Sequence, residues 1–577
     1  MLSPEDYETG CLMAQEDEER LSPAQDEGYQ SFIVKYNQNV YGQEEYASDS
    51  TFQVIDDYFA IVYTPLEKGR EPEITSYSYN SIPKCYTYMD VEALNASGVT
   101  RLHEHPYLKL RGRGTAVAVI DSGIDYTNPV FQDENGSKIL CLWDQTIPGE
   151  GNEGAPFGRV FTKREIDKAL GEEEPLSIVP SMDTNGHGTM VAGAAAGSMR
   201  EQEDFSGAAP EASLIIIKLK PAKRYLREFY LLPANAEAFQ EDDLMLAVSF
   251  AMEQAKKYRM PLSICIGLGT SQGAHLGYSP LSQFAGSAAS FSQNSISVAA
   301  GNEGMARHHF DGNIGEGGEE ETAELRIGED TDGFTMELWG EPSENYQITI
   351  QSPTGENLEV STAVRSTTQE LSFVFVETKI LVNYIAIERQ SGNSLVFFRF
   401  LHPAAGLWRI KVRGDGRERA RFHIWLPVTG LIPEGTYFLQ SSPYYTVTSP
   451  GDSIECMTST AYQYRDNSLF LEASRGFTPI GSVKPNFAAP GVGIRVPLLS
   501  GGFGEASGSS LAAAQTAGIA ALMFEWAVIR GNEPFFSGNS VKNYLQRGAR
   551  RDEGLSYPNP EWGYGRVNLY HTFELLT

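Results

Sequence analysis

Cysteine is scarce in this chain of 577 residues. The five cysteines are spread along the chain, their number is odd, and no two of them form a CxxC pair. Disulfide scaffolds and thiolate zinc sites both need paired or closely spaced cysteines. The sequence therefore excludes both, and it fits a compartment in which thiols stay reduced.

Basic residues are also in short supply, with 45 Lys and Arg against 75 Asp and Glu, a formal net charge of −30. Such a surface repels nucleic-acid phosphates and anionic lipids, so we expect neither a nucleic acid nor a membrane as a partner. We interpret the acidity as an aid to solubility. Hydrophobic residues still make up 41% of the chain, which is enough for a large core and excludes a disordered protein.

No signal peptide is recognisable, because the first twenty residues are acidic and lack both a basic and an apolar region. The longest apolar stretch, residues 510–529, is rich in alanine but contains Gln515, Thr516 and Glu525. We interpret it as a buried helix and not as a membrane span. These absences predict an intracellular protein.

The first part of the chain predicts a small module. Residues 1–30 are strongly acidic and are expected to form a solvated leader. Two strand-like runs follow, residues 32–36 and 52–63, and they favour a small α+β module that ends before about residue 95.

Apolar runs and a helical pattern alternate in the next part of the chain. Residues 243–258 have helical spacing, with Asp243 expected to cap the helix. The alternation predicts an α/β fold with a doubly wound parallel sheet. The runs that are typical of buried parallel strands are residues 115–120, 214–219, 262–269 and 295–302.

Residues 320–445 have a different texture, with short strand-like runs between turn residues, residues 371–378 among them, and almost no helical periodicity. They predict an all-β sandwich or jelly roll. The glycine- and glutamate-rich residues 315–321 are interpreted as a hinge, and the α/β texture returns after about residue 450. The β module is therefore predicted to be inserted into the α/β domain.

Three motifs carry the residue types of nucleophilic catalysis. Asp121 ends an apolar run in VAVIDSGID, while His187 and Ser510 open alanine-rich helices in DTNGHGTMVAG and SGSSLAAA. Taken singly, the three have ordinary explanations: a strand-end aspartate, a structural or exposed histidine, and a serine cap. Together they follow the chain order Asp, His, Ser of subtilisin-type proteases.

The three motifs closely resemble those of the subtilase family of serine proteases. Four further stretches agree with that family in the same order, SGAAPEASLIIIKL, IGLG, AAGNEG and KPNFAAPG. The chain departs from the family pattern at Met190, where the family has a second histidine, and at Leu511, where it has a methionine. Neither departure removes a catalytic group.

The resemblance implies a role for each residue of the triad. Ser510 would attack the scissile carbonyl, His187 would move the proton, and Asp121 would orient His187. The side-chain amide of Asn302, with the backbone N–H of Ser510, would bind the oxyanion.

The resemblance also makes Gly267, Leu268 and Gly269 the edge that pairs with an extended substrate. The alternative interpretation of this stretch is a glycine loop at the edge of a sheet. The preferred P1 residue is not assignable from the sequence.

The family pattern implies four parts. Residues 1–95 would form the leader and propeptide, residues 96–310 and 450–577 the split catalytic domain, and residues 311–449 the inserted jelly-roll-like domain. We expect self-cleavage between about residues 80 and 98, with the propeptide remaining in the cleft.

We expect no required cofactor and no metal site. Calcium often stabilises subtilases, but the chain has no Asp-rich calcium loop. A structural calcium site made of residues from separate segments is compatible with the sequence, which does not reveal its ligands. The histidines of LHEHP, residues 102–106, and the pair His308 and His309 are interpreted as exposed turn residues.

The insertion between Asn302 and Ser510, the acidity and the missing signal peptide are together similar to the clostridial Csp-type germination proteases. That resemblance implies a protein substrate, the precursor of a spore cortex-lytic enzyme, and a location in the spore. One alternative is a general intracellular subtilase with another substrate. Another is a pseudoprotease that acts as a signalling or binding protein, although the triad and Asn302 are all present.

Overall fold

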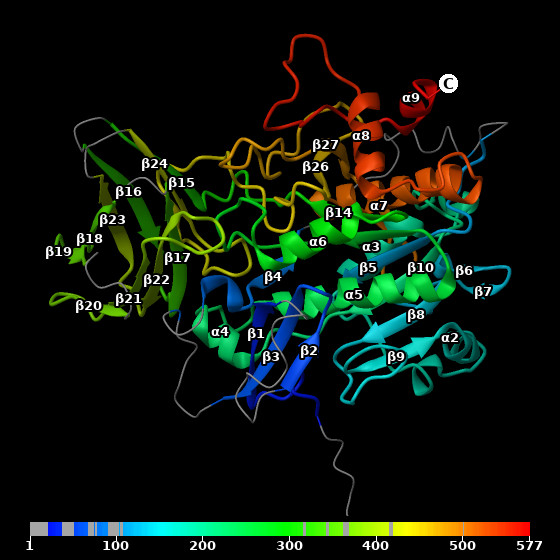
Figure 1. Cartoon of the computed structure of the whole chain (residues 1–577), viewed down its shortest axis with the longest axis horizontal. Coiled ribbons are helices and arrows are strands. Elements are labelled where there is room, and N and C mark those ends of the chain that lie inside the picture. Colours follow the sequence, from blue (N-terminus) through cyan, green and yellow to red (C-terminus); the bar gives the residue numbers. More distant parts are fainter. Residues whose placement is uncertain are drawn as a thin grey trace, which may run out of the picture.

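The structure is a computed structural model in which three parts are arranged around a large sheet (Figure 1). A small N-terminal sheet packs against one side of an α/β body, and an all-β part extends from one end of it. The structure describes residues 21–36, 51–66, 74, 78–89, 103, 108–315, 319–341, 345–361, 368–414, 419–499 and 501–576. The acidic leader therefore lies mostly outside the described residues.

The α/β body is built on a sheet of eight strands, all parallel except the edge strand β9. This confirms the predicted doubly wound sheet. The run 262–269 breaks at Gly267, so its last two residues, β13 (Leu268–Gly269), belong to another sheet. In spatial order the eight strands are β27 (Phe487–Val492), β26 (Met457–Gln463), β14 (Asn294–Ala299), β12 (Leu262–Ile266), β5 (Ala116–Asp121), β10 (Ser213–Lys218), β8 (Ile139–Asp144) and β9 (Arg159–Thr162).

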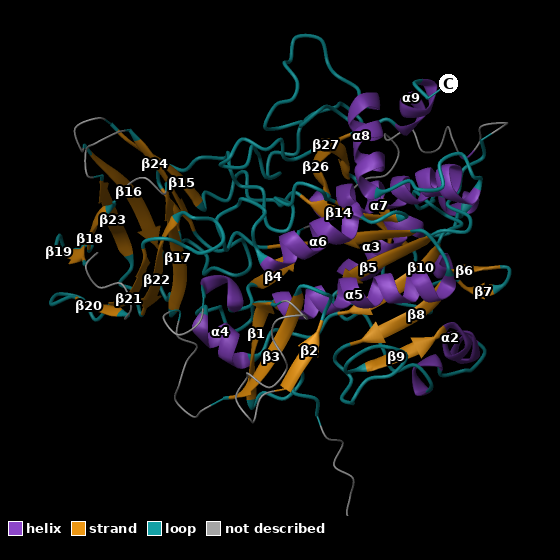
Figure 2. Cartoon of the chain, viewed as in Figure 1, coloured by secondary structure: helices purple, strands orange, loops and turns teal. Residues whose placement is uncertain are grey.

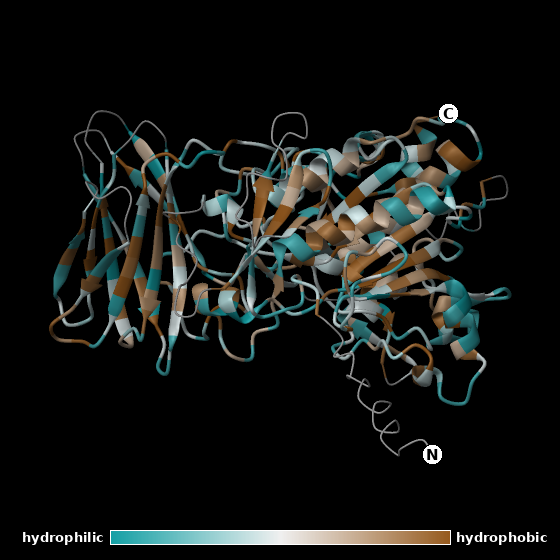
Figure 3. Cartoon of the chain, turned by 60° about the horizontal axis from the view of Figure 1, so that its bottom comes forward, coloured by the Kyte–Doolittle hydropathy of each residue, from teal (hydrophilic) through white to brown (hydrophobic). Residues whose placement is uncertain are grey.

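Helices cover both faces of this sheet, which is why its strands are almost wholly hydrophobic (Figure 3). Along β5, Val117 and Val119 face α3 (His187–Ala196) and α7 (Ser509–Phe524). The alternate residues of β5 face α5 (Glu241–Tyr258) and α6 (Pro280–Ser290). The predicted helix 243–258 begins two residues earlier, so the expected cap at Asp243 is wrong. Gln240 is the N-cap, and the Asp243 carboxylate instead lies 2.6 Å from Lys220.

Helix α7 continues into a π-helical turn, Glu525–Ile529. The whole stretch, Ser509–Ile529, is long and apolar enough to cross a membrane, yet 83% of its most apolar window is buried inside the protein. It is the central helix of the core, as predicted. The smaller elements of the body are α2 (Lys163–Leu170), α4 (Arg224–Phe229), α8 (Gly538–Gly548), α9 (Leu569–Glu574), β6 (Gln132–Asp133), β7 (Gly136–Ser137), β28 (Ile494–Pro497) and β29 (Phe503–Ala506).

The all-β part consists of two antiparallel sheets that share one core, and no helix lies among its described residues (Figure 2). One sheet has the order β15 (His309–Ile314), β24 (Ala420–Trp425), β17 (Gly333–Gly340), β22 (Ser394–Leu401), β21 (Lys379–Ile385) and β20 (Gln369–Ser372). The other has the order β19 (Asn357–Val360), β18 (Gln347–Gln351), β23 (Gly406–Arg413), β16 (Glu320–Ile327) and β25 (Tyr437–Phe438).

Two sequence-based expectations fail in this part. The strand-like run 371–378 is a strand only in its first two residues, which end β20, and Val374 and Phe375 are exposed in the bend between β20 and β21. His309 is buried on β15 rather than exposed in a turn, and its Nε2 lies 3.0 Å from Nδ1 of His423. Near the N-terminus, His103 is likewise buried, with its Nε2 2.9 Å from the Ala208 carbonyl. The exposure of these residues was predicted wrongly because a single sequence does not show which distant neighbours cover a side chain.

The N-terminal sheet has the order β1 (Tyr29–Lys35), β3 (Phe59–Pro65) and β2 (Thr51–Val54). The predicted run 52–63 is split because Asp56 forms a turn, in which its Oδ1 accepts the N–H groups of Tyr58 and Phe59. The sheet packs on α5 and α6 through a shared hydrophobic core. Beyond it, β4 (Cys85–Tyr88) forms a separate small sheet between β11 (Phe239–Gln240) and β13.

Candidate active site

Asp121, His187 and Ser510 meet at the carboxyl end of the large sheet. His187 Nδ1 lies 2.7 Å from Asp121 Oδ1, and His187 Nε2 lies 3.2 Å from Ser510 Oγ. All three side chains are buried. These are the two hydrogen bonds that a nucleophile, a base and an orienting carboxylate need.

Each residue reaches this point because an apolar element ends or begins there. Asp121 is the last residue of β5, where doubly wound sheets bind ligands, and it accepts a 2.8 Å hydrogen bond from the N–H of Ser122. His187 is the first residue of α3, after Gly186, whose φ of 95° favours glycine. Ser510 lies in the first turn of α7.

The surroundings of His187 set its basicity. Burial alone lowers the pKa of His187, but the charge and hydrogen bond of Asp121 raise it, as do the Met89 carbonyl and Asp183. The net effect is a raised pKa. A more basic imidazole is better able to accept a proton from a serine hydroxyl.

Asn302 lies in the loop after β14 and lines the same cavity as His187. Its Oδ1 accepts a 3.2 Å hydrogen bond from the N–H of Ser509, and the Ser509 hydroxyl accepts one of 3.1 Å from the N–H of Gly301. This pair of bonds joins the Asn302 loop to the first turn of α7. The Oδ1 bond leaves the Asn302 NH₂ group available as a donor near the N-terminus of α7, where an oxyanion site needs one.

The predicted edge, Gly267, Leu268 and Gly269, is already paired with a strand of the same chain. Leu268 and Gly269 pair antiparallel with Tyr88 and Thr87 of β4, and the N–H of Met89 donates to the Gly267 carbonyl at 3.1 Å. On its other side β4 pairs with β11. An extended segment therefore lies in the cleft in the way a substrate adds to a sheet edge.

Met89 reaches the triad at the end of this segment. Its carbonyl oxygen accepts a hydrogen bond from Ser510 Oγ and lies 3.3 Å from His187 Nε2. The ring of Tyr88 covers His187, with the two ring centroids 4.6 Å apart. No sequence motif marks Met89, and its place beside Ser510 follows from the register of β4 on β13.

Gly267 is required by the crowding at this point. A Cβ added to it would lie 3.0 Å from Ser510 Cβ and 3.2 Å from His187 Cε1. Any side chain there would push against the nucleophile and the base. The Met89 side chain is buried next to Gly269. Beyond β4, a cavity of about 730 Å³ lined by His187, Asn302 and Met89 continues from the site.

Asp183 belongs to the histidine motif, but nothing in the sequence indicates its role. Its carboxylate is buried and accepts hydrogen bonds from the N–H groups of Asn185, Gly186 and Thr189, and from the hydroxyls of Ser122 and Thr189. It therefore holds the turn before His187 against the end of β5.

No group of three or more metal-ligating side chains occurs in the part of the chain that the structure describes. Four of the five cysteines are described there, and all four are buried and free.

Comparison with known proteins shows similarity in both sequence and fold. A model of the subtilase family matches residues 112–565. The CspB protease of Clostridium perfringens is 33% identical in sequence, and its structure matches with a TM-score of 0.74 over 83% of this chain and 96% of that chain. Pyrolysin of Pyrococcus furiosus is 33% identical over 120 residues, which are 20% of this chain and only 8% of pyrolysin. The chain therefore belongs to the subtilase family of serine peptidases.

Proposed function

We propose that this subtilase is an endopeptidase that cleaves its own chain between Met89 and Asp90. The observation that carries the proposal is the position of the Met89 carbonyl, which contacts Ser510 Oγ and lies 3.3 Å from His187 Nε2. Pairing of β4 with β13 holds this carbonyl in an extended substrate-like chain. In this proposal the chain up to Met89 is the leader and propeptide, and its segment β4 to Met89 occupies the cleft.

The proposed reaction proceeds through an acyl-enzyme. Ser510 Oγ bonds to the Met89 carbonyl carbon while His187 takes the hydroxyl proton, and Asp121 stabilises the imidazolium. The Asn302 amide and the Ser510 N–H bind the oxyanion. His187 then protonates the leaving amine of Asp90, and water, deprotonated by His187, hydrolyses the ester to free Ser510 and the Met89 carboxylate.

Intact mass and N-terminal sequencing of the purified full-length protein test this proposal. We expect two fragments, residues 1–89 and 90–577, from the unmodified chain. The Ser510→Ala variant should stay a single chain because it lacks the nucleophile. Asn302→Ala should slow cleavage about 10²- to 10³-fold, the loss found for the corresponding oxyanion donor of a subtilisin.

A matched serine provides the control. Ser292→Ala changes an exposed serine in the turn between α6 and β14 and keeps every proposed reacting group, so this variant should cleave at the normal rate. Cleavage of Ser510→Ala after Met89 in a protease-free preparation would show that the triad is wrongly assigned. Cleavage of the unmodified chain at another bond would show that Met89 is not the P1 residue.

We further propose that the physiological substrate is a spore protein, the precursor of a cortex-lytic enzyme, and that the protease acts inside the spore. The likeness to the CspB protease over 96% of that chain supports this, together with the insertion between Asn302 and Ser510. The test is incubation of the precursor with the processed protease and with Ser510→Ala. A precursor that stays intact with both would favour the alternative, a general intracellular subtilase.

A pseudoprotease is the alternative from another class. A fluorophosphonate probe should label Ser510 after the propeptide has been removed by limited proteolysis. Absence of labelling in that sample would favour a binding or signalling protein.

A further inference from the structure

Three buried glutamates lie beside the segment that leads into the cleft. Glu241 is the first residue of α5, while Glu337 lies on β17 and Glu388 follows β21 in the all-β part. Each is at most 4% exposed. Each accepts a hydrogen bond from residues 79–84, part of the cleft-binding segment, residues 79–89. The α/β body and the all-β part therefore both contact this one segment.

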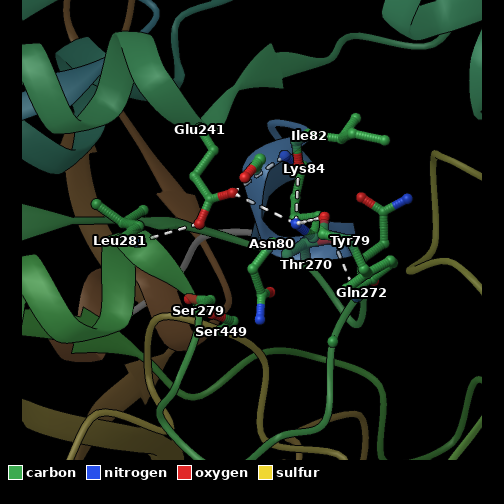
Figure 4. Close-up of polar contacts among 12 residues, drawn as sticks. Tyr79, Asn80, Ile82, Lys84, Glu241, Thr270, Gln272, Ser279, Leu281 and Ser449 are labelled. Atoms are coloured by element: carbon green, nitrogen blue, oxygen red, sulfur yellow. Dashed lines mark hydrogen bonds and ion pairs between the residues drawn. The ribbon is translucent and has the colours of Figure 1, made fainter. Parts of the chain in front are cut away.

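Glu241 binds Lys84 (Figure 4). Its Oε2 accepts the Lys84 backbone N–H at 3.1 Å and lies 3.9 Å from Lys84 Nζ, while Oε1 accepts the N–H of Leu281 at 3.1 Å. The Lys84 ammonium also donates to the carbonyls of Tyr79 and Ile82 at 3.0 and 2.8 Å. Lys84 is 1% exposed, so its ammonium is buried with two carbonyl acceptors and the nearby carboxylate of Glu241.

In each of the two glutamates of the all-β part, donors of the enzyme bind one carboxylate oxygen, and the other oxygen accepts a hydrogen bond from the cleft-binding segment. Glu337 Oε2 is engaged by the N–H of Gly273 and the indole N–H of Trp339, so Oε1 is left to accept the Tyr79 hydroxyl at 2.5 Å. These donors belong to the enzyme itself, so the carboxylate is preorganised before a chain arrives.

Glu388 is arranged in the same way. Its Oε2 accepts the N–H groups of Gln390 and Ser391 and the Ser391 hydroxyl. Its Oε1 accepts the side-chain amide of Asn80 at 3.1 Å. Two preorganised carboxylates therefore contact adjacent residues of the segment.

The negative charge of the three glutamates favours a bound chain that carries a basic residue. Burial lowers the pKa of Lys84, and Glu241, Glu337 and Glu388 each act to raise it. Without a chain in place, Glu241 would lose the Lys84 ammonium and amide and keep only the Leu281 N–H. A chain that binds here takes the Glu241 carboxylate out of water, and a buried carboxylate without a cation is costly, so the surface favours a chain that brings a basic residue to this point.

The number of residues between Lys84 and Met89 determines which carbonyl lies at Ser510 when Lys84 is bound. Lys84 lies five residues before Met89, and the intervening residues form β4, which is paired on both sides. An extended strand has little freedom to stretch or shorten. Binding at Lys84 therefore determines which carbonyl reaches Ser510.

We propose that Glu241, Glu337 and Glu388 form an exosite that selects polypeptide substrates by a basic residue five positions before the residue whose carbonyl is attacked. Hydrogen-bond donors four and five positions further upstream complete the recognised pattern, as Asn80 and Tyr79 do here. The exosite sets the register of the bound chain. This inference rests on the proposed function, namely that the bond cut follows Met89.

A two-residue insertion in the full-length chain tests whether the spacing from Lys84 determines the bond that is cut. A Thr-Tyr pair inserted between Tyr88 and Met89 repeats the preceding dipeptide, so the alternation of the strand is kept. If the exosite sets the register, the cut moves to the bond after the inserted threonine, five residues after Lys84. If the P1 pocket sets it, the cut still follows Met89 and the proposal is overturned. Intact mass distinguishes the two fragments.

A second measurement does not depend on cleavage. In the Ser510→Ala background, Glu241→Gln, Glu337→Gln and Glu388→Gln should each reduce the hydrogen-exchange protection of residues 79–89 about tenfold or more. The control is Glu324→Gln, because Glu324 pairs with Arg409 at 3.0 Å on β16 instead. Unchanged protection in all three variants would overturn the exosite.

The two proposals fail in different ways. If the unmodified chain is not cut, the proposed self-cleavage fails, and the exchange experiment alone decides the exosite. If the unmodified chain is cut after Met89 while the three variants match the control, the exosite fails and the protease assignment stands.

Discussion

At the scale of single residues, the position of His187 depends on Asp183. Asp183 Oδ2 accepts both the N–H and the hydroxyl of Thr189, and Oδ1 accepts the Ser122 hydroxyl. The Ser122 hydroxyl in turn accepts the N–H of Gly188. Because every partner of Asp183 is a donor, an amide in its place would turn its NH₂ group against at least one of them.

We therefore expect Asp183→Asn to slow self-cleavage. An unsatisfied buried group costs about 1–3 kcal/mol, which corresponds to a loss of rate of roughly 5- to 160-fold if the cost falls on the aligned site. The pH profile should change as well. The charge of Asp183 raises the pKa of His187, so its removal lowers that pKa and keeps the base neutral to lower pH.

The measurement is the cleavage rate as a function of pH. The acidic limb of the profile should move to lower pH in Asp183→Asn, while Asp133→Asn, an exposed aspartate, should leave the profile unchanged. An acidic limb that moves to higher pH would contradict the electrostatic part of the argument.

At the scale of elements, helix α7 links the nucleophile to the start of the sheet. Ser510 lies in its first turn, and Glu525 follows its last residue. Glu525 Oε2 accepts the backbone N–H groups of Arg111, Gly112 and Arg113 at 2.8, 2.8 and 3.2 Å. These three residues precede β5, which ends at Asp121, so one side chain holds together the elements that carry two members of the triad.

Glu525→Ala should lower the stability of the protein by about 1–3 kcal/mol, because it leaves backbone donors without an acceptor at a partly buried site. Chemical denaturation measures the change. Glu553→Ala replaces an exposed glutamate and should change the stability by less than about 0.5 kcal/mol. Equal effects of the two substitutions would contradict the role of Glu525.

At the scale of the whole molecule, three parts of the chain share one core. Phe229 of α4 stacks on Phe397 of β22, with ring centroids 5.8 Å apart, and Tyr79 and Ile82 of the cleft-binding segment belong to the same cluster. The all-β part is thus joined to the body and to the N-terminal segment by hydrophobic contact as well as by the exosite. We expect the three parts to unfold together.

Phe397→Ala should cost about 3–5 kcal/mol, because Phe397 is fully buried. Calorimetry should show a single transition at a lower Tm. Phe375→Ala removes a phenylalanine of the same part that is 73% exposed, and it should leave the Tm nearly unchanged. Two separate transitions in the unmodified protein would show that the shared core does not couple the parts.

Most of the fold class could be predicted because it depends on local patterns. The buried strands β5, β10 and β14 are continuous apolar runs, and α5 has clear helical spacing, so their type was correct and only their ends moved. Errors occurred where burial depends on distant neighbours. The run 371–378 has the residues of a strand, yet the strand ends at Ser372 and the chain then bends over the surface. His309, in contrast, is covered by β24.

The sequence by itself determined the family, the α/β and all-β textures, and the identity of Asp121, His187, Ser510 and Asn302 as candidates. These follow from short motifs whose residues are neighbours along the chain. Only the tertiary structure decided that Met89 meets Ser510 and that Lys84 lies beside Glu241. Strand register and the burial of charge depend on contacts between residues hundreds of positions apart, and no local pattern in one sequence contains that information.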